Sequence, residues 1–239
     1  MLSKCLILWI GYFVASTNAG VVSWIKPCAP LDSACIIKSA EFALPYVAKG
    51  VEELGIPAIE PMSIKDTIAV SGELKVKFRN VKIHQLSKCK FESFTRDPVK
   101  STASSAVICP TVIKGEYSMN GTIFLLNIFG DGAFSIEDGT MHTTTDYKLK
   151  SFTKQGKKHY KVSSFDYKFE PVTKYTIKFE NLLNGDKEQA EPVEKIMNEA
   201  WKELILELGQ PIMKEAMTTL AGTIDKVFKA IPAEELEIV

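Results

Sequence analysis

The stretch EPVEKIMNEAWKELILELGQPIMKEAMTTLAGTIDKVFKA (Glu191–Ala230) carries apolar residues at helical spacing along its whole length. These are Val193, Ile196, Met197, Ala200, Trp201, Leu204, Leu208, Ile212, Ala216, Leu220, Ile224, Val227 and Phe228. Pro192 suits the first turn of a helix, and Pro211 is expected to kink the helix without necessarily ending it. About 40 residues at 1.5 Å each predict a rod of roughly 60 Å. Such a helix needs a long partner to bury its apolar stripe.

The only long partner in the sequence is a series of strand-like segments from Lys88 to Phe179. Apolar and polar residues alternate there, and GDG at residues 130–132 and KQGKK at residues 154–158 read as turns. The alternation excludes an all-helical bundle, and the lack of helices between strands excludes a βαβ fold. We therefore predict an α+β domain in which a strongly curved antiparallel sheet wraps a long C-terminal α-helix.

The segment before this meander is expected to begin with a short helix. Asp32 suits its N-cap, the apolar spacing predicts a helix to Lys49, and Pro45 should bend it. A strap with Pro57 and Pro61 follows, up to residue 65. A long strand then runs from residue 68 to residue 83, and a change of parity near residues 79–80 predicts a β-bulge.

Residues 1–19 have the features of a secretory signal peptide, with Lys4 near the start, an apolar run from Cys5 to Val14 and small residues at Thr17 and Ala19. A membrane anchor is the alternative, but the apolar run is shorter than the ~20 residues that span a bilayer. We therefore expect a secreted, extracellular, soluble protein with one domain over residues 20–239.

Removal of this peptide leaves 28 basic residues (29 minus Lys4) and 29 acidic residues. This balance gives no strong overall field for nucleic acid or anionic lipid. We therefore expect no nucleic-acid partner and no stable membrane anchor, and we expect a monomer.

Four cysteines remain in a compartment that permits disulfides: Cys28, Cys35, Cys89 and Cys109. They allow three pairings. Cys28 and Cys35 are close in sequence, with turn-forming residues between them. Cys89 and Cys109 lie symmetrically about the turn-like DPVKS, so a hairpin there would place them opposite each other. Zinc ligation is the alternative, but the paired C-x-x-C units that it requires are missing, and we expect no metal site.

Enzyme signatures are missing from the sequence. It has no G-x-S-x-G, H-E-x-x-H, P-loop or dinucleotide fingerprint. His84, His142 and His159 lie in strand or turn contexts, where ordinary hydrogen-bonded histidines are expected. The chain is therefore predicted not to be an enzyme and to need no cofactor.

Apolar side chains supply a candidate ligand site, because a sheet curled around one helix leaves an elongated space along the seam and methionines adapt to varied ligand shapes. The alternative is that these residues are ordinary core. The candidate ligand-binding residues are Leu44, Val47, Val70, Leu74, Val76, Tyr117, Met119, Phe134, Met141, Tyr147, Phe165, Met197, Trp201, Leu204, Leu208, Ile212, Met213, Met217 and Leu220.

Asn120-Gly121-Thr122 is an N-glycosylation sequon. In a secreted protein Asn120 is a candidate acceptor. The alternative is a structural role for Asn-Gly in a turn or bulge.

Several motifs together resemble the takeout and juvenile-hormone-binding protein family of insects. They are CAPLDSAC followed by ALPYVAKGVEELGIPAIEPMSI, then IKGEYSMNG, GDGAFSIEDG, VEKIMNEAWKELILELGQPIMKEAM and FKAIPAEEL. The resemblance covers essentially the whole mature chain. It implies a secreted carrier of small hydrophobic ligands, with one long helix wrapped by a curved sheet and an internal tunnel.

The positions of the cysteines indicate which branch of the family the chain resembles. Cys28 and Cys35 match the N-terminal disulfide of the family, whereas Cys89 and Cys109 do not match the second bridge of the hormone-binding branch. This departure favours the takeout-like branch. The expected ligand is a fatty acid, a terpenoid or a juvenile-hormone-like molecule. A secreted receptor- or membrane-interaction protein with no bound small ligand is the alternative.

Overall fold

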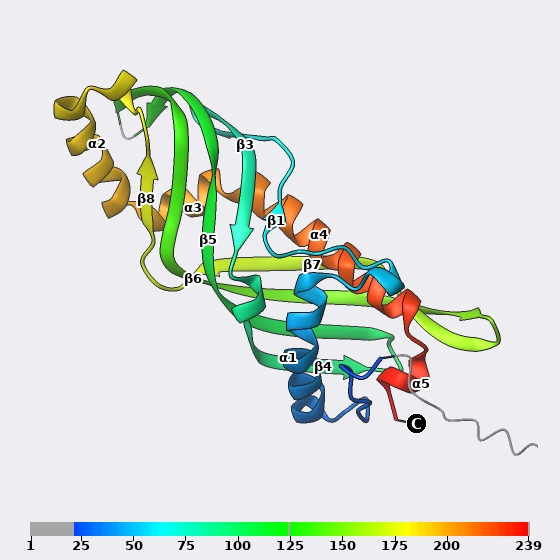
Figure 1. The fold of residues 1–239 in the computed structure, drawn as a ribbon. Coiled ribbons are helices and arrows are strands. Elements are labelled where there is room, and N and C mark those ends of the chain that lie inside the picture. Colours follow the sequence, from blue (N-terminus) through cyan, green and yellow to red (C-terminus); the bar gives the residue numbers. More distant parts are fainter. Residues whose placement is uncertain (1–21, 124, 239) are drawn as a thin grey trace, which may run out of the picture.

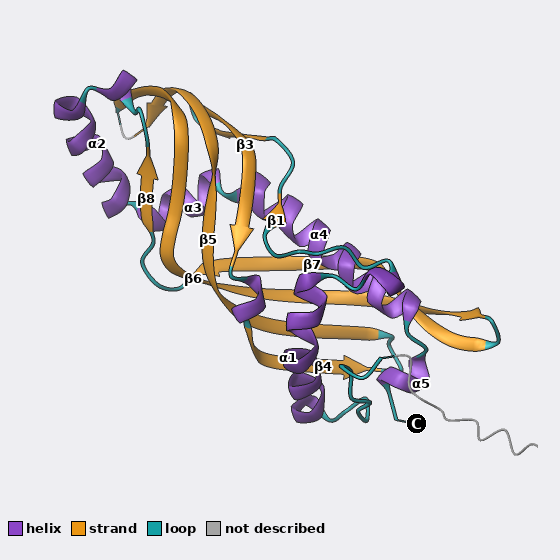
Figure 2. Ribbon diagram, viewed as in Figure 1, coloured by secondary structure: helices purple, strands orange, loops and turns teal. Residues whose placement is uncertain are grey.

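The computed structural model describes residues 22–123 and 125–238. It contains an open, strongly curved antiparallel sheet of eight strands, with helices α3 and α4 crossing one side of it (Figures 1 and 2). The predicted signal peptide lies outside the described residues. In the described ranges, no helix has the length and apolar character needed to cross a bilayer. The α+β class and the curved antiparallel sheet agree with the prediction.

Two long neighbouring strands form the middle of the sheet, β5 (Thr102–Ile123) and β6 (Leu126–Lys154). They pair with each other along nearly their whole length. On the far side of β6, β8 (Thr176–Phe179) pairs with its first half and β7 (Lys157–Pro171) with its second half. β3 (Leu74–His84) and β4 (Lys90–Asp97) pair with the two halves of β5. Two halves of one sheet therefore share the same two strands.

A bend separates these halves, where both long strands turn sharply (Figure 2). The register of the β5–β6 pair shifts between Thr111 and Ile113, and Asp138 on β6 has a φ of 67°. The neighbouring Gly139 has no side chain, and a Cβ there would lie 2.3 Å from the ring of Tyr175. A bulge and a glycine covered by a tyrosine ring thus let the strands bend.

The expectation of a turn at GDG is wrong, because residues 130–132 lie inside β6. Gly132 pairs with Tyr117 of β5, and the backbone of Glu180 crosses it so closely that a Cβ would lie 2.5 Å from the Glu180 carbonyl oxygen. The glycine therefore permits a close backbone approach instead of ending the strand.

The C-terminal helical region is divided into α2 (Lys187–Glu199), α3 (Trp201–Leu208) and α4 (Gln210–Ala230), so the single rod of the prediction is wrong. α2 lies beside β8, and α3 and α4 continue across the sheet (Figure 1). The Asn198 side chain accepts from the Ile177 N–H and donates to the Ile177 carbonyl, both at 2.8 Å. This clamp holds the end of α2 on β8, and the helix breaks at Ala200. Pro211 lies in the first turn of α4, where its missing N–H is tolerated.

The N-terminal part follows the sequence expectation closely. α1 (Ser33–Lys49) is capped by the Asp32 carboxylate, which accepts from the Cys35 N–H at 2.9 Å. A strap with the 3₁₀ turn Glu52–Leu54 and the short strand β1 (Met62–Ser63) leads to the sheet. Short 3₁₀ turns also span Leu86–Lys88 and Leu183–Gly185, and α5 (Ala233–Leu236) ends the helical region.

The strand predicted from residue 68 to residue 83 is a hairpin of β2 (Thr67–Ser71) and β3, with a turn at Gly72, whose φ is 57°. The turn reverses the parity of the first strand, so Ala69 is buried and Val70 is 65% exposed. The expectation that Val70 faces the interior is therefore wrong. The predicted bulge is confirmed, since the β3–β5 register shifts between Arg79 and Lys82.

Both disulfides join the cysteines that spacing had favoured, Cys28 with Cys35 and Cys89 with Cys109. The second bridge connects the start of β4 to β5 beside the paired residues Lys90 and Ile108. The main apolar core lies between the sheet and the helices α3 and α4. A smaller cluster forms where Trp24 and Ile231 pack with Ala43 of α1.

Candidate ligand cavity

A cavity of about 350 Å³ lies at one end of the molecule, where its lining residues come from α1, from strands β4 to β7 and from the C-terminal half of α4. Its wall is predominantly apolar. Small-molecule sites in proteins have volumes of ~300–1,000 Å³, so this space is large enough for a ligand.

Strand and helix periodicity explain which side chains face the cavity. On β5 and β6 every second residue contributes, and on α4 the residues recur at helical spacing. The β5 residues are Ala103, Ser105, Val107 and Cys109, the β6 residues are Thr143, Thr145, Tyr147 and Leu149, and the α4 residues are Met217, Leu220, Thr223, Ile224, Val227 and Phe228. From the other side α1 contributes Ile36, Ala40, Ala43, Leu44 and Val47.

A cluster of hydroxyl groups interrupts this apolar wall. Ser105 and Thr145 are opposite each other on β5 and β6, and Tyr147 lies two residues further along β6. All three residues are buried. Burial raises the pKa of Tyr147, and hydrogen bonds with Thr145 and Ser105 partly oppose this rise. The phenol therefore stays neutral at physiological pH and supplies a hydrogen-bonding group without charge.

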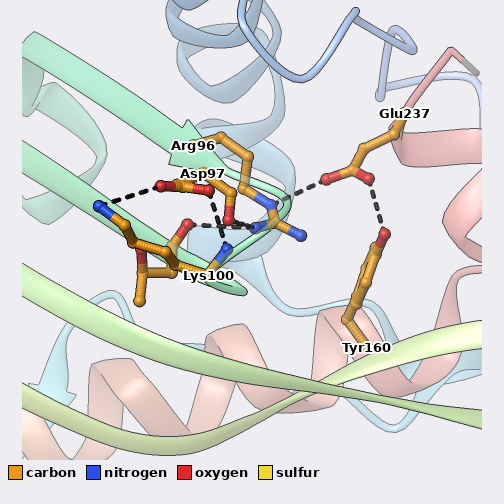
Figure 3. Close-up of polar contacts among 6 residues, drawn as sticks. Arg96, Asp97, Lys100, Tyr160 and Glu237 are labelled. Carbon is orange, nitrogen blue, oxygen red and sulfur yellow. Dashed lines mark hydrogen bonds and ion pairs between the residues drawn. The ribbon is translucent and has the colours of Figure 1, made fainter.

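An ion pair forms part of the wall near the C-terminus (Figure 3). Arg96 Nε donates to Glu237 Oε1 at 3.0 Å, and Tyr160 Oη donates to Glu237 Oε2 at 2.7 Å. Arg96 Nη1 donates to the carbonyls of Asp97 and Thr102 at 2.7 and 3.1 Å. The side chains of Arg96 and Glu237 are 5% and 18% exposed. The cation is thus paired and hydrogen-bonded by the protein itself.

The chain around Glu237 also closes the cavity through its backbone. The Cys28 N–H donates to the Leu236 carbonyl at 3.1 Å, and the Ile238 N–H donates to the Cys28 carbonyl at 3.0 Å. Cys28 is thereby joined both to the C-terminal segment and, through its disulfide with Cys35, to the first turn of α1.

A second, much smaller cavity of about 40 Å³ lies where α2, α3 and the start of α4 face the other half of the sheet. Tyr175 is one of its lining residues, and burial raises the pKa of this tyrosine to about 12. Met213 lines this cavity, whereas Met217, one turn further along α4, lines the large one. The two cavities therefore follow each other along the same helix.

The structure divides the candidate ligand-binding residues into groups. Those that line the large cavity are Leu44, Val47, Tyr147, Met217 and Leu220. Those that line the small cavity are Met141, Met197, Leu204, Leu208, Ile212 and Met213. Leu74, Val76, Tyr117, Met119 and Phe134 are buried core residues outside both linings, and Phe165 and Trp201 pack against this core. Val70 is on the surface.

Sequence reasoning missed the polar part of the wall. Thr145 shares the strand parity of Tyr147, so extension of the alternation could have found it. Arg96 and Glu237 are 141 residues apart and carry no local signal of their pairing. No group of three metal-ligating side chains occurs among the residues that the structure describes.

Comparisons with known proteins give one family. A family model described as haemolymph juvenile hormone binding protein matches residues 6–237. The circadian clock-controlled protein daywake of Drosophila melanogaster is 21% identical over 243 residues, which cover 96% of this chain and 93% of the relative. Daywake of Drosophila yakuba is 21% identical over 245 residues with the same coverage.

A solved structure has the same fold. The crystal structure of Takeout 1 from Epiphyas postvittana superposes with a TM-score of 0.86 at 22% identity, covering 90% of this chain and 100% of that chain. At this identity the likeness shows the fold alone.

Proposed function

Because this chain belongs to the haemolymph juvenile hormone binding protein family, we propose that it is a secreted carrier that binds one small hydrophobic ligand in the large cavity. The observation that carries the proposal is the cavity of about 350 Å³ with its predominantly apolar wall, covered by α1. The family is named for the binding of a hydrophobic hormone. Carriage of this kind requires no catalytic group.

Apolar burial alone provides enough free energy for such binding. A sixteen-carbon chain gains about 12 kcal/mol at ~0.8 kcal/mol per methylene, before association and ordering costs of several kcal/mol are subtracted. The remainder corresponds to micromolar to nanomolar affinity.

The hydroxyl groups of Ser105, Thr145 and Tyr147 favour a ligand that carries an oxygen function, since these neutral groups can hydrogen-bond a carbonyl, ester, epoxide or hydroxyl. Arg96 is less suited to a ligand carboxylate, because Glu237 already pairs with it. A terpenoid or acyl derivative with one polar group meets both conditions.

We further propose that the two cavities are ends of one tunnel when a long ligand is bound. Met213 and Met217 lie between them on α4, and Met141 lines the small cavity beside Thr143 of the large one. Methionine side chains change rotamer easily and fill irregular spaces, so a modest rearrangement would join the cavities.

Titration with a fluorescent fatty acid tests the carrier function. We expect saturable uptake near one molecule per protein, with displacement by an unlabelled terpenoid or acyl compound. Fluorescence that rises without saturation, or a probe that no competitor displaces, would count against an internal site.

The α1 end of the cavity is proposed as the ligand entrance. Changing both Cys28 and Cys35 to serine removes the covalent link between α1 and residue 28, whose backbone hydrogen-bonds to the C-terminal segment. We expect roughly tenfold faster probe release, because opening this end no longer has to overcome the disulfide constraint, which contributes ~2–4 kcal/mol in typical proteins. Stopped-flow displacement measures the rate.

Changing Cys89 and Cys109 to serine is the matched control, because that bridge also lies in the cavity wall but joins β4 to β5 and leaves α1 attached to Cys28. Its release rate should stay closer to that of the unmodified protein. Equal acceleration in both variants, or none in the first, would argue against entry beside α1.

We also propose that Asn120 is glycosylated in the secreted protein. The residue is exposed on β5, and Asn120-Gly121 lies within the strand instead of forming its turn. A glycan on this side chain would extend into solvent.

A further inference from the structure

One hairpin of this nearly neutral chain is rich in positive charge. Residues 147–165 contain six lysines and no acidic residue. They are Lys148, Lys150, Lys154, Lys157, Lys158 and Lys161. The end of β6 and the start of β7 carry them, and the hairpin projects beyond the rest of the molecule (Figure 1). The chain as a whole is therefore nearly neutral, but this projecting segment is basic. We call it the lysine hairpin (residues 148–161).

The register of the lysine hairpin places like charges opposite each other. Lys150 pairs with Lys161, and Lys154 pairs with Lys157. Directly opposed like charges destabilise a strand pair. Within the described residues, Lys148, Lys150 and Lys154 form no ion pair, whereas Lys157 pairs with Glu234 at 2.9 Å, which raises the pKa of that lysine. An anionic surface would relieve the repulsion that the protein leaves in place.

The same strands form the cavity wall. Tyr147, Leu149 and Tyr160 line the large cavity, and strand alternation places Lys148 and Lys150 on the opposite face of β6. Contact through the lysine hairpin would therefore hold the cavity close to the bound surface.

A neighbouring turn adds an apolar group at this end. Val99 in the β4–β5 turn is 92% exposed and is followed by Lys100, whose charge is paired with Asp97 at 3.7 Å. The turn adjoins the lysine hairpin, since the Leu149 N–H donates to the Ser101 carbonyl at 2.8 Å and Thr102 pairs with Lys148. An exposed valine beside lysines suits the boundary between lipid headgroups and acyl chains, where the apolar side chain can be buried. A soluble polyanion has no apolar region in which the valine could be buried.

We propose that the lysine hairpin and the turn with Val99 dock this protein reversibly on anionic lipid bilayers. Each lysine close to an anionic bilayer contributes about 1 kcal/mol, or about fivefold in the partition coefficient. The interaction acts within a Debye length of about 8 Å at physiological ionic strength, so it is reversible and weakens with salt. Docking goes beyond ligand carriage and does not depend on a bound ligand.

Vesicle flotation tests the proposal, with phosphatidylcholine vesicles that contain or lack phosphatidylserine. The full chain should float with the anionic vesicles and be released by salt. Changing Lys150 and Lys154 to glutamine should lower the partition coefficient about 25-fold, and Val99→Ser should lower it further. Titration with the fluorescent fatty acid should be unaffected by these changes, which separates this test from that of the carrier function.

The matched control changes Lys75 and Lys77 to glutamine, because both are exposed lysines on β3, away from the hairpin, and the net charge changes equally. This variant should partition almost like the unmodified protein. Equal loss in both variants, equal binding to neutral vesicles, or binding to a sulfated polysaccharide without binding to vesicles would each overturn the assignment to an anionic bilayer.

Discussion

Replacing Ala103 by tryptophan is expected to weaken binding of a lipophilic probe by at least ~100-fold, which corresponds to about 2.7 kcal/mol. Ala103 is 5% exposed on β5 and faces the large cavity, where it packs with Tyr147 and Leu149. An indole at this position occupies space that the ligand needs, and the cavity gives the larger side chain room. Equilibrium titration with the fluorescent fatty acid measures the change.

A tryptophan at Ser164 is the matched control, because this residue is exposed on β7 opposite Lys148. It should leave the affinity unchanged. Overpacking a core costs about 1–3 kcal/mol, so urea unfolding of both variants establishes that the titrations use folded protein. Full affinity in the folded Ala103→Trp variant would show that the probe binds elsewhere.

Replacing Arg96 by alanine is expected to lower the free energy of unfolding by about 3–5 kcal/mol, the loss typical when one partner of a buried ion pair is removed. Of the two described side chains that bind the Glu237 carboxylate, Tyr160 alone would remain, and the carbonyls of Asp97 and Thr102 would lose the Arg96 donor. Because the pair forms part of the cavity wall, probe release should also accelerate. Urea denaturation and stopped-flow displacement measure the two effects.

Lys114→Ala serves as the comparison. Its ion pair with Glu137 is 2.8 Å long, but the two side chains are 56% and 33% exposed. Exposed pairs contribute about 0–1 kcal/mol, so this variant should be nearly as stable as the unmodified protein. A similarly small decrease in the free energy of unfolding in both variants would show that burial does not increase the contribution of the Arg96–Glu237 pair to stability.

Periodicity made much of the fold predictable. Asp32 and the spacing up to Lys49 defined α1, and alternation identified the strands that bend around α4. Prediction failed where tertiary contacts decide the backbone. The sequence near Ala200 gives no sign of a helix break, because the break depends on the hydrogen bonds between Asn198 and Ile177 of β8, which lies 21 residues earlier in the chain. Likewise, the sequence around Gly132 predicts a turn, because the close approach of the Glu180 backbone that explains this glycine is a tertiary contact.

The same distinction applies to the cavity. Tyr147 and Met217 were found because strand and helix periods turn them toward the space between sheet and helix. Val70 was placed inside because a turn at Gly72 was read as continuous strand. Arg96 and Glu237 meet only because the chain returns to this end after α4, so no short-range pattern could pair them.

The most direct test of the carrier function is organic extraction of the natively purified protein, followed by mass spectrometry of the extract. The proposed function predicts close to one molecule of a hydrophobic compound with an oxygen function per protein, and a much smaller amount from the Ala103→Trp variant purified in the same way. An extract without any stoichiometric apolar compound, from protein that also fails to take up a lipophilic probe, would contradict ligand carriage.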